Sequence, residues 1–259
     1  MRVAVTGAAG RMGIEVCRTI DATDDLELVA AVDPQAAGSA LAEVAGFDTP
    51  ITIAGDLEAI ADAGADVAVD FTHPSVVGAN LLWLLDHGIH AVVGTTGIAD
   101  DDLQAARQRA ADGAANAVVA PNFAIGAVLM MQFSAQAARH LPSVEIVELH
   151  HDRKADAPSG TALRTAELIA GSRTDDVTPI GGDDDHPGAR GTNEHGVPIH
   201  SVRLPGLVAH QQVQFGGQGE TLTIRHDSLD RSSFMPGVLA AIRGVSGLDG
   251  LVVGLEHVL

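Results

Sequence analysis

Short apolar runs alternate with longer amphipathic stretches over the first half of the chain. The apolar runs favour strands buried on both faces, and the amphipathic stretches favour helices that cover them. The expected strands are 3–6, 26–32, 67–71, 90–93 and 117–120, with 49–53 as an extra strand. The expected helices are 11–20, 41–45, 57–63, 74–86 and 100–112. This order predicts an α/β fold with a Rossmann-like, doubly wound parallel sheet.

The pattern changes after residue 123, where runs of alternating polarity replace the buried runs. The expected strands are 144–149, 197–204, 207–215 and 220–226, and the expected helices are 126–140 and 161–170. Residues 171–196 are expected to form a long loop, and a helix at 233–244 and a strand at 251–255 close the chain. This pattern predicts a second α+β domain with a mixed or antiparallel sheet. Because few helices are available to cover both faces, we expect that sheet to serve oligomerisation.

Composition narrows the class of protein. The 259 residues are 46% hydrophobic and 19% charged, as in a folded chain of two ordinary domains or one large α/β domain. A net charge of −19 argues against nucleic acid or an anionic membrane as a partner. The lone Cys17 excludes a disulfide framework and favours a reducing compartment. With no secretory signal or membrane-spanning stretch in the sequence, we expect a cytoplasmic protein.

A glycine-rich turn lies between the first expected strand and the first expected helix. Backbone amides at such a helix start favour a pyrophosphate, and glycine lets the backbone come close to it. The spacing is G-x-x-G-x-x-G, and the candidate cofactor residues are Gly7, Ala8, Ala9, Gly10, Arg11 and Met12. An ordinary tight strand-to-helix turn is the alternative interpretation.

Asp33 supports the interpretation as a dinucleotide site. It lies twenty residues beyond Gly13, at the end of the second expected strand, where an acid can hydrogen-bond the adenosine ribose. A carboxylate there repels a 2′-phosphate, and Arg11 is the only nearby cation able to attract one. We therefore expect NADH to be used well and leave NADPH open.

Two later strand ends belong to the same predicted cleft, because ligands bind beyond the carboxyl ends of parallel strands. Their small hydroxyl and amide side chains suit a nicotinamide riboside, although each segment also has the composition of an ordinary loop. The candidate residues are Gly94, Thr95, Thr96, Ala120, Pro121, Asn122 and Phe123.

The densest polar segment is 148–162, which leaves a strand and enters a helix after Pro158. Ser159, Gly160 and Thr161 lie at that helix start, which is typical of a site for a substrate carboxylate. Lys154 is the one lysine among fifteen basic residues, so its place in this segment indicates a chemical need for an amine.

His150 and His151 suit two different roles, because adjacent strand residues point to opposite faces. One histidine is expected to act as the general acid and the other to hold the substrate. No H-E-x-x-H motif or cysteine cluster is present, so no metal is expected. Ser159 also lacks the G-x-S-x-G context of a nucleophile.

The run E-L-H-H-D-R-K-A-D-A-P-S-G-T-A at 148–162 resembles the signature of the dihydrodipicolinate reductase family. Agreement extends over nearly the whole chain, through V-T-G-A-A-G-R-M-G at 5–13, D-F-T-H-P at 70–74, G-T-T-G at 94–97, A-P-N-F-A-I-G at 120–126 and R-H-D-S-L-D-R at 225–231. The resemblance implies NADH- or NADPH-dependent reduction of (2S,4S)-4-hydroxy-2,3,4,5-tetrahydrodipicolinate at ring C4. Water is lost, and the product tetrahydrodipicolinate lies on the diaminopimelate route to lysine.

The resemblance also implies roles for residues. His150 matches the general acid/base, Lys154 the proton donor, and His151 with Gly160 and Thr161 the substrate contacts. It implies a dinucleotide-binding domain of residues 1–123 and 231–259, and a substrate-binding domain of residues 124–230 through which a homotetramer forms. Some family members place a basic residue directly after the Asp33 position, whereas Pro34 and Gln35 follow here, which puts a preference for NADPH in doubt.

Two alternatives stay open from the residues alone. One is another two-domain NAD(P)-dependent dehydrogenase, acting on a sugar or an amino-acid semialdehyde, for which H-H-x-x-K would be incidental. The other is a regulator that senses NAD(H) without turnover, which would have no reason to keep Lys154 together with both histidines.

Overall fold

The computed structural model describes residues 1–173, 186 and 188–259, and the chain divides into two compact units. Unit 1 comprises residues 1–123 and 234–259, and unit 2 comprises residues 124–233. The later boundary lies three residues beyond the predicted one at 231, after most of a short 3₁₀ turn at Arg231–Phe234.

Unit 1 contains a six-stranded sheet in the order β11-β5-β4-β3-β1-β2, with every pair parallel. The strands are β1 Arg2–Thr6, β2 Glu27–Val32, β3 Val67–Asp70, β4 His90–Val93, β5 Ala117–Val119 and β11 Leu251–Val253. The α-helices are α1 Arg11–Asp21, α2 Leu41–Ala45, α3 Glu58–Asp62, α4 Pro74–Asp86, α5 Asp100–Asp112 and α8 Met235–Gly244. Short 3₁₀ turns occur at Pro34–Ala36, Val245–Gly247 and Leu255–His257.

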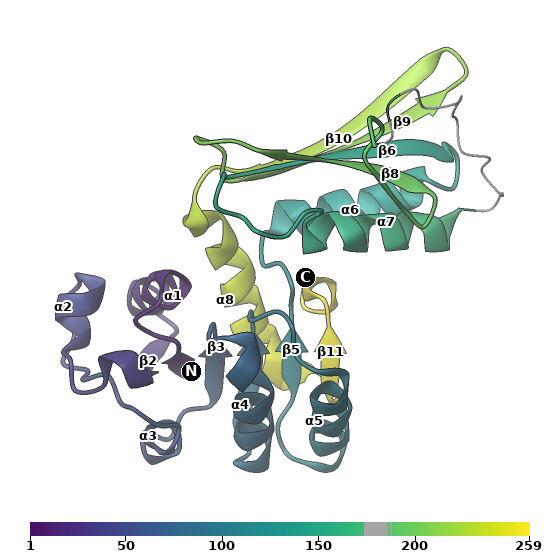
Figure 1. The fold of residues 1–259 in the computed structure, drawn as a ribbon. Helices are drawn as coiled ribbons and strands as arrows, with labels where there is room; N and C mark the ends of the chain where they lie inside the picture. The colour runs from purple at the N-terminus through teal and green to yellow at the C-terminus, as the bar shows by residue number, and fades with distance from the viewer. Residues whose placement is uncertain (174–185, 187) are drawn as a thin grey trace. The chain divides into compact units, whose positions relative to one another are not determined.

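The central strands β1, β3 and β4 of unit 1 are buried on both faces, as their continuous apolar runs predict. In β1, Val3, Ala4 and Val5 are completely buried. Helix α1 packs against α8, and α4 packs against α5, so that the sheet is covered from two sides (Figure 1). The predicted doubly wound architecture is confirmed. Strand order reverses around β1, which places the predicted ligand crevice at the carboxyl ends of β1, β3 and β4.

The extra strand expected at 49–53 is wrong. Within this segment only Thr52 forms a bridge, to Ala40, and Ala54 just beyond it forms another, to Val32. Pro50 has no amide hydrogen to donate to a ladder, and Ile51 and Ile53 hydrogen-bond the backbone of residues 38–41 and not that of β2.

Unit 2 contains a five-stranded mixed sheet in the order β10-β9-β6-β8-β7, in which only β6 and β8 are parallel. The strands are β6 Ser143–His150, β7 Thr192–Glu194, β8 Val197–Arg203, β9 Ala209–Gly217 and β10 Glu220–Ser228. The helices are α6 Ile125–Ala137 and α7 Gly160–Ser172, and both lie on one face of the sheet (Figure 1). The predicted α+β unit with a mixed sheet is confirmed.

Strand β7 corrects the prediction that 171–196 is a loop without regular structure. His195 and Gly196 both adopt positive φ, at 52° and 77°, and connect β7 to β8 as a two-residue hairpin turn. The prediction for residues 174–185 and 187 lies outside the described residues. No helix among the described residues is long and apolar enough to cross a membrane.

Candidate active site

The glycine-rich turn of unit 1 is shaped by close backbone packing. Gly7 has φ +73°, and a Cβ on it would lie 2.4 Å from the carbonyl oxygen of Phe71. A Cβ on Gly13 would lie 2.0 Å from the carbonyl oxygen of Gly7. Only glycine fits at these two positions, because the turn runs directly against β3 and the first turn of α1.

Asp33 holds this turn from the end of β2. One carboxylate oxygen accepts from the Ala9 amide at 3.1 Å, and the other accepts from the Gln35 amide at 3.0 Å. The Val32 carbonyl accepts from the amides of Gly7 and Ala8. The two segments in which the sequence predicts cofactor contacts are therefore brought together.

A cavity of about 370 Å³ opens beside the turn, within unit 1. Its lining includes six of the predicted cofactor residues: Gly10, Arg11, Met12, Gly94, Thr95 and Thr96. The remaining lining residues, which the site prediction omitted, are Phe71, Thr72 and Pro74. The D-F-T-H-P run at 70–74 was the signal that could have placed them, since it follows directly on β3.

Asp70 is the hub of this wall and was also missed. Its side chain is buried, and it accepts hydrogen bonds from neutral groups only. The donors are the hydroxyls of Thr6 (2.9 Å), Thr72 (2.7 Å) and Thr95 (2.9 Å), the side-chain amide of Asn80 (2.8 Å) and the backbone amide of Thr72 (3.0 Å). The hydroxyl hydrogen of Thr95 is therefore committed to Asp70, which leaves its oxygen lone pairs and its backbone for a ligand.

The predicted segment 120–123 continues this wall and does not line the cavity. The Ala120 amide donates to the Val93 carbonyl at 2.9 Å. Phe123 is buried, with its ring centroid 5.7 Å from that of Phe71. Pro121 is exposed and Asn122 is half-buried.

These features fit a nicotinamide dinucleotide. Helix α1 begins at the cavity with no side-chain cap and no acidic residue in its first turn, so its amides can meet a pyrophosphate. Arg11 is exposed and lines the cavity, and its side chain has no hydrogen-bond or ion-pair partner among the described residues.

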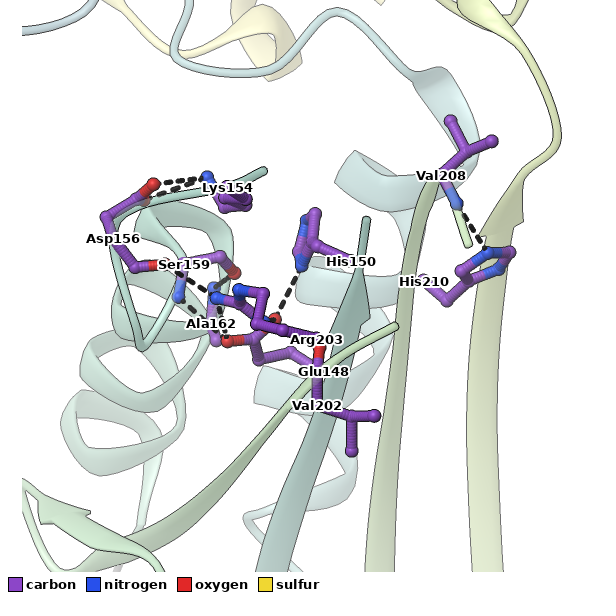
Figure 2. Close-up of polar contacts among 10 residues, drawn as sticks. All are labelled: Glu148, His150, Lys154, Asp156, Ser159, Ala162, Val202, Arg203, Val208 and His210. Carbon is purple, nitrogen blue, oxygen red and sulfur yellow. Dashed lines mark hydrogen bonds and ion pairs between the residues drawn. The ribbon is translucent and has the colours of Figure 1, made fainter. Parts of the chain in front are cut away.

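Glu148 organises the polar cluster of unit 2 (Figure 2). Its side chain is completely buried, and both of its carboxylate oxygens accept hydrogen bonds. The Arg203 guanidinium donates to both oxygens at 2.8 Å, and the Ser159 amide donates to Oε1 at 3.2 Å. The His150 Nδ1 lies 2.5 Å from Oε2. Three segments of unit 2, namely β6, β8 and the start of α7, therefore meet at one carboxylate.

The environment of Glu148 determines its charge and the tautomer of His150. Burial alone would raise the pKa of Glu148, but hydrogen bonds from His150, Arg203 and Ser201 lower that pKa to about 2. The carboxylate is therefore ionised near neutral pH and can only accept hydrogen bonds. Nδ1 of His150 must then carry a hydrogen, which leaves Nε2 to gain or lose the mobile proton.

Lys154 lies in the loop after β6, with a side chain that is only 23% exposed. Its Nζ donates to both carboxylate oxygens of Asp156, each at 2.8 Å. Burial opposes the charge of Asp156, but the hydrogen bond and charge of Lys154 lower the pKa of that carboxyl. Arg203 also donates to the Asp156 carbonyl oxygen at 2.6 Å, which ties the lysine loop to Glu148.

The residues at the start of α7, where the sequence predicts an anion site, differ in how open they are. No acidic residue occupies the first turn of α7, and a Cβ on Gly160 would meet nothing within 4 Å. Thr161 is half-buried beside it. The hydroxyl of Ser159, however, is buried and caps the helix by accepting from the Ala162 amide at 3.3 Å. This places Ser159 as a support of the helix start.

His151 is half-buried, and its Nδ1 is a buried nitrogen without a hydrogen-bond partner among the described residues. Its carbonyl accepts from the Lys154 amide at 3.2 Å, so it belongs to the same turn as the lysine. Across the described residues, no group of three histidine, cysteine, aspartate or glutamate side chains is arranged to hold a metal ion.

Sequence reasoning missed Glu148, Arg203 and Asp156 as members of this cluster. The signal for Glu148 was its phase, because it continues the inward positions of β6 set by Val144 and Ile146. A charged residue on the buried face of a strand requires partners. Arg203 has no such local signal, since it reaches Glu148 only through the pairing of β8 with β6.

Comparisons with known proteins agree over both units. A family model described as dihydrodipicolinate reductase, N-terminus, matches residues 1–123, and one described as dihydrodipicolinate reductase, C-terminus, matches residues 126–259. A curated relative from Mycobacterium sp. (strain KMS), named 4-hydroxy-tetrahydrodipicolinate reductase, is 53% identical over 266 residues, covering 100% of this chain and 99% of the relative.

Solved structures give the same picture. The dipicolinate-bound dihydrodipicolinate reductase from Paenisporosarcina sp. TG-14 is 44% identical with a TM-score of 0.88, covering 100% of this chain and 99% of that one. A myo-inositol dehydrogenase from Corynebacterium glutamicum ATCC 13032 has a TM-score of 0.62 at 16% identity, covering 100% of this chain and 92% of that one. The second likeness shows the fold alone.

Proposed function

This chain belongs to the dihydrodipicolinate reductase family, and from that membership we propose how its residues carry out the family's reaction. The reaction is the NAD(P)H-dependent reduction of (2S,4S)-4-hydroxy-2,3,4,5-tetrahydrodipicolinate to tetrahydrodipicolinate with loss of water, on the diaminopimelate route to L-lysine. Residues 1–123 and the C-terminal segment, predicted to start at 231, would bind the dinucleotide. Residues 124–230 would bind the dicarboxylate.

The assignment of roles depends above all on the cluster around Glu148. In a chain of net charge −19, an imidazole, an ammonium and a helix start without acidic residues gather in one part of unit 2. A dianionic substrate needs such a place. The dipicolinate bound to the relative from Paenisporosarcina supports a dicarboxylate as the ligand.

His150 would serve as the general acid/base through Nε2, since Nδ1 is held by Glu148. Loss of the C4 hydroxyl as water needs a proton, and Lys154 would be a second proton donor. The reduced nicotinamide supplies the hydride when it is bound. Acid catalysis of this kind contributes about 10²–10⁴-fold to a rate.

His151, Gly160 and Thr161 would hold a substrate carboxylate. The open space at Gly160 and the lack of acidic residues in the first turn of α7 favour this position. Asp156 presents two oxygens to Lys154 in the way that a substrate carboxylate would, so we expect the substrate to displace Asp156 from the ammonium. Ser159 would contribute through its cap of the helix.

The dinucleotide would be held by Gly7 to Met12, Asp33, Gly94 to Thr96 and Ala120 to Phe123. We propose that NADH is used at least as well as NADPH, because the Asp33 carboxylate at the end of β2 repels a 2′-phosphate. The positive charge of Arg11 would attract a 2′-phosphate and so would allow NADPH to bind as well.

A pair of variants tests this cofactor assignment. Asp33→Asn keeps an oxygen acceptor for the turn but removes the charge, so the ratio of kcat/KM for NADPH over NADH should rise. Arg11→Gln should lower the same ratio. A large preference of the wild type for NADPH would show that Asp33 is misinterpreted.

The proposed function is tested by oxidation of NADH in an assay coupled to the synthase that makes the unstable substrate. Steady turnover is expected with this substrate, and none with sugars or amino-acid semialdehydes. If no NADH is oxidised in the coupled assay although the protein binds NADH, the result would favour a regulator that senses NAD(H).

We further propose a cytoplasmic homotetramer. In the described part of unit 2, no helix covers the face of the sheet opposite α6 and α7 (Figure 1). The edge strand β10 is largely exposed. Light scattering after gel filtration should give four times the mass of one chain, and cell fractionation should recover activity with cytoplasmic enzymes.

A further inference from the structure

Glu148 and Arg203 form the most completely buried arginine–carboxylate ion pair among the described residues, and the reaction assigned to this chain gives neither a role. Resting on that proposed function, we propose that they are positioning residues: Glu148 selects the proton-carrying nitrogen of His150, and Arg203 connects this carboxylate to the Lys154 loop.

The first step is the tautomer. Glu148 accepts from Nδ1 of His150, and three further donors reach the same carboxylate from Arg203 and the Ser159 amide. A carboxylate held in this way cannot rotate to release His150. A ring with hydrogen fixed on Nδ1 presents Nε2, and only Nε2, for proton exchange with a ligand.

The second step is the coupling of two proton donors. One guanidinium nitrogen of Arg203 bonds both Glu148 Oε1, at 2.8 Å, and the carbonyl of Asp156, at 2.6 Å. The Asp156 carboxylate in turn holds Lys154. The positions of His150 and Lys154 therefore depend on the same buried pair (Figure 2).

The charged groups near His150 from each neighbouring element are few. Strand β8 contributes Arg203, and the loop after β6 contributes His151, Lys154 and Asp156. On β9, His210 is bound to Asp227 of β10, and the first turn of α7 contains no acidic residue. Within the described part of the chain, Glu148 is the only carboxylate hydrogen-bonded to His150.

A matched control lies on the same strand. Glu145 also contacts an arginine and a histidine, Arg190 and His200, but it is 38% exposed. It lies at the opposite phase of β6 from Glu148. Neutralising Glu145 therefore removes a similar set of contacts without touching the cluster that holds Lys154.

The kinetic test compares Glu148→Gln, Glu145→Gln and His150→Gln with the wild-type enzyme in the coupled assay. Glu148→Gln should lower kcat by about 10²-fold with a smaller change in KM. The reason is that the proton-carrying nitrogen of the general acid His150 is no longer fixed, whereas the substrate contacts stay. Glu145→Gln should keep kcat near the wild-type value. In the His150→Gln background, Glu148→Gln should cost little more, because the two residues act as one unit.

The tautomer is measured directly in the wild-type protein by NMR of ¹⁵N-labelled histidine at neutral pH, with His150 assigned by its absence from His150→Gln. The proposal requires the Nδ1–H form. The Nε2–H form would overturn it. Equal losses of kcat in Glu148→Gln and Glu145→Gln would also overturn it, and so would a loss of kcat in the His150→Gln, Glu148→Gln double variant equal to the product of the two single losses. If Glu148→Gln fails to fold, the NMR measurement of the His150 tautomer in the wild type tests the proposal by itself. If the wild type does not turn over the substrate, the proposed function fails, but the same NMR measurement still tests whether Glu148 fixes the hydrogen on Nδ1.

Discussion

Asp70 in unit 1 and Glu148 in unit 2 are both buried carboxylates near the carboxyl ends of strands, but they are satisfied by different kinds of donor. Hydroxyls and amides surround Asp70, and none of its donors is charged. Glu148 is bound by a guanidinium and an imidazole. The first arrangement fixes the directions of polar side chains, and the second also sets which groups carry protons.

This difference matches what each unit is proposed to do. A dinucleotide site must keep its shape, and Asp70 holds Thr72 and Thr95 in the wall of the cavity. A site that removes the substrate hydroxyl as water must supply a proton to it, and Glu148 holds the His150 imidazole that would supply this proton. Neutral networks suit the first task and charge-assisted ones suit the second.

The largest expected effect is on proton donation in unit 2. Lys154→Ala should lower kcat by about 10³-fold, in the range of a lost general acid. NADH binding, measured by fluorescence titration, should be unchanged. Arg153→Ala is the control, since this neighbour is exposed and should leave turnover intact. Near-normal turnover of Lys154→Ala would remove the lysine from the chemistry.

The next largest effect is on stability, through the buried pair. Arg203→Leu leaves the Glu148 carboxylate buried without its main partner, and should lower the free energy of unfolding by about 3–5 kcal/mol. The double variant with Glu148→Leu should recover much of that loss, because no charge stays unpaired. Urea unfolding measures both, and equal losses in the single and double variants would contradict the assignment.

Asp70→Asn should have a smaller effect, because its donors are neutral. The amide offers one acceptor oxygen where the carboxylate offers two, so about 1–3 kcal/mol is expected for the donors left unpaired. The KM for the dinucleotide should rise as Thr95 loses its orientation. Asp66→Asn, exposed at the start of β3, is the matched control. An unchanged KM in Asp70→Asn would separate this hub from the cofactor site.

The last expected effect concerns the pH dependence of stability. The pKa of Glu148 is lowered in the folded protein from 4.5 to about 2. Its stabilising contribution is therefore full above pH 4.5 and is lost as the pH falls toward 2. Over that interval the wild type should lose more stability than Glu148→Gln. Parallel curves for the two proteins would mean that Glu148 titrates normally.

The sequence predicted the parts of this account that depend on local pattern. Buried apolar runs predicted the parallel sheet of unit 1, and the segment containing His150 and Lys154 was found from its composition. The hubs could not be predicted in the same way. Arg203 lies 55 residues from Glu148, and only the β6–β8 register brings them together. Strand β7 was missed because its hairpin turn uses His195, an unusual residue at positive φ.

The most direct test of the contrast between the two hubs is the pH profile of kcat, measured for Glu148→Gln and Asp70→Asn beside the wild type. A carboxylate can only accept a hydrogen bond from Nδ1 of His150, whereas the amide of Glu148→Gln can also donate one, so the variant no longer fixes which nitrogen carries the hydrogen. At saturating dinucleotide, kcat of Glu148→Gln should therefore lie about 10²-fold below the wild-type value across the profile, while the Asp70→Asn profile should keep the wild-type shape and height. A loss of kcat in both variants, or in neither, would contradict the division of labour between a neutral hub that holds shape and a charged hub that controls a proton.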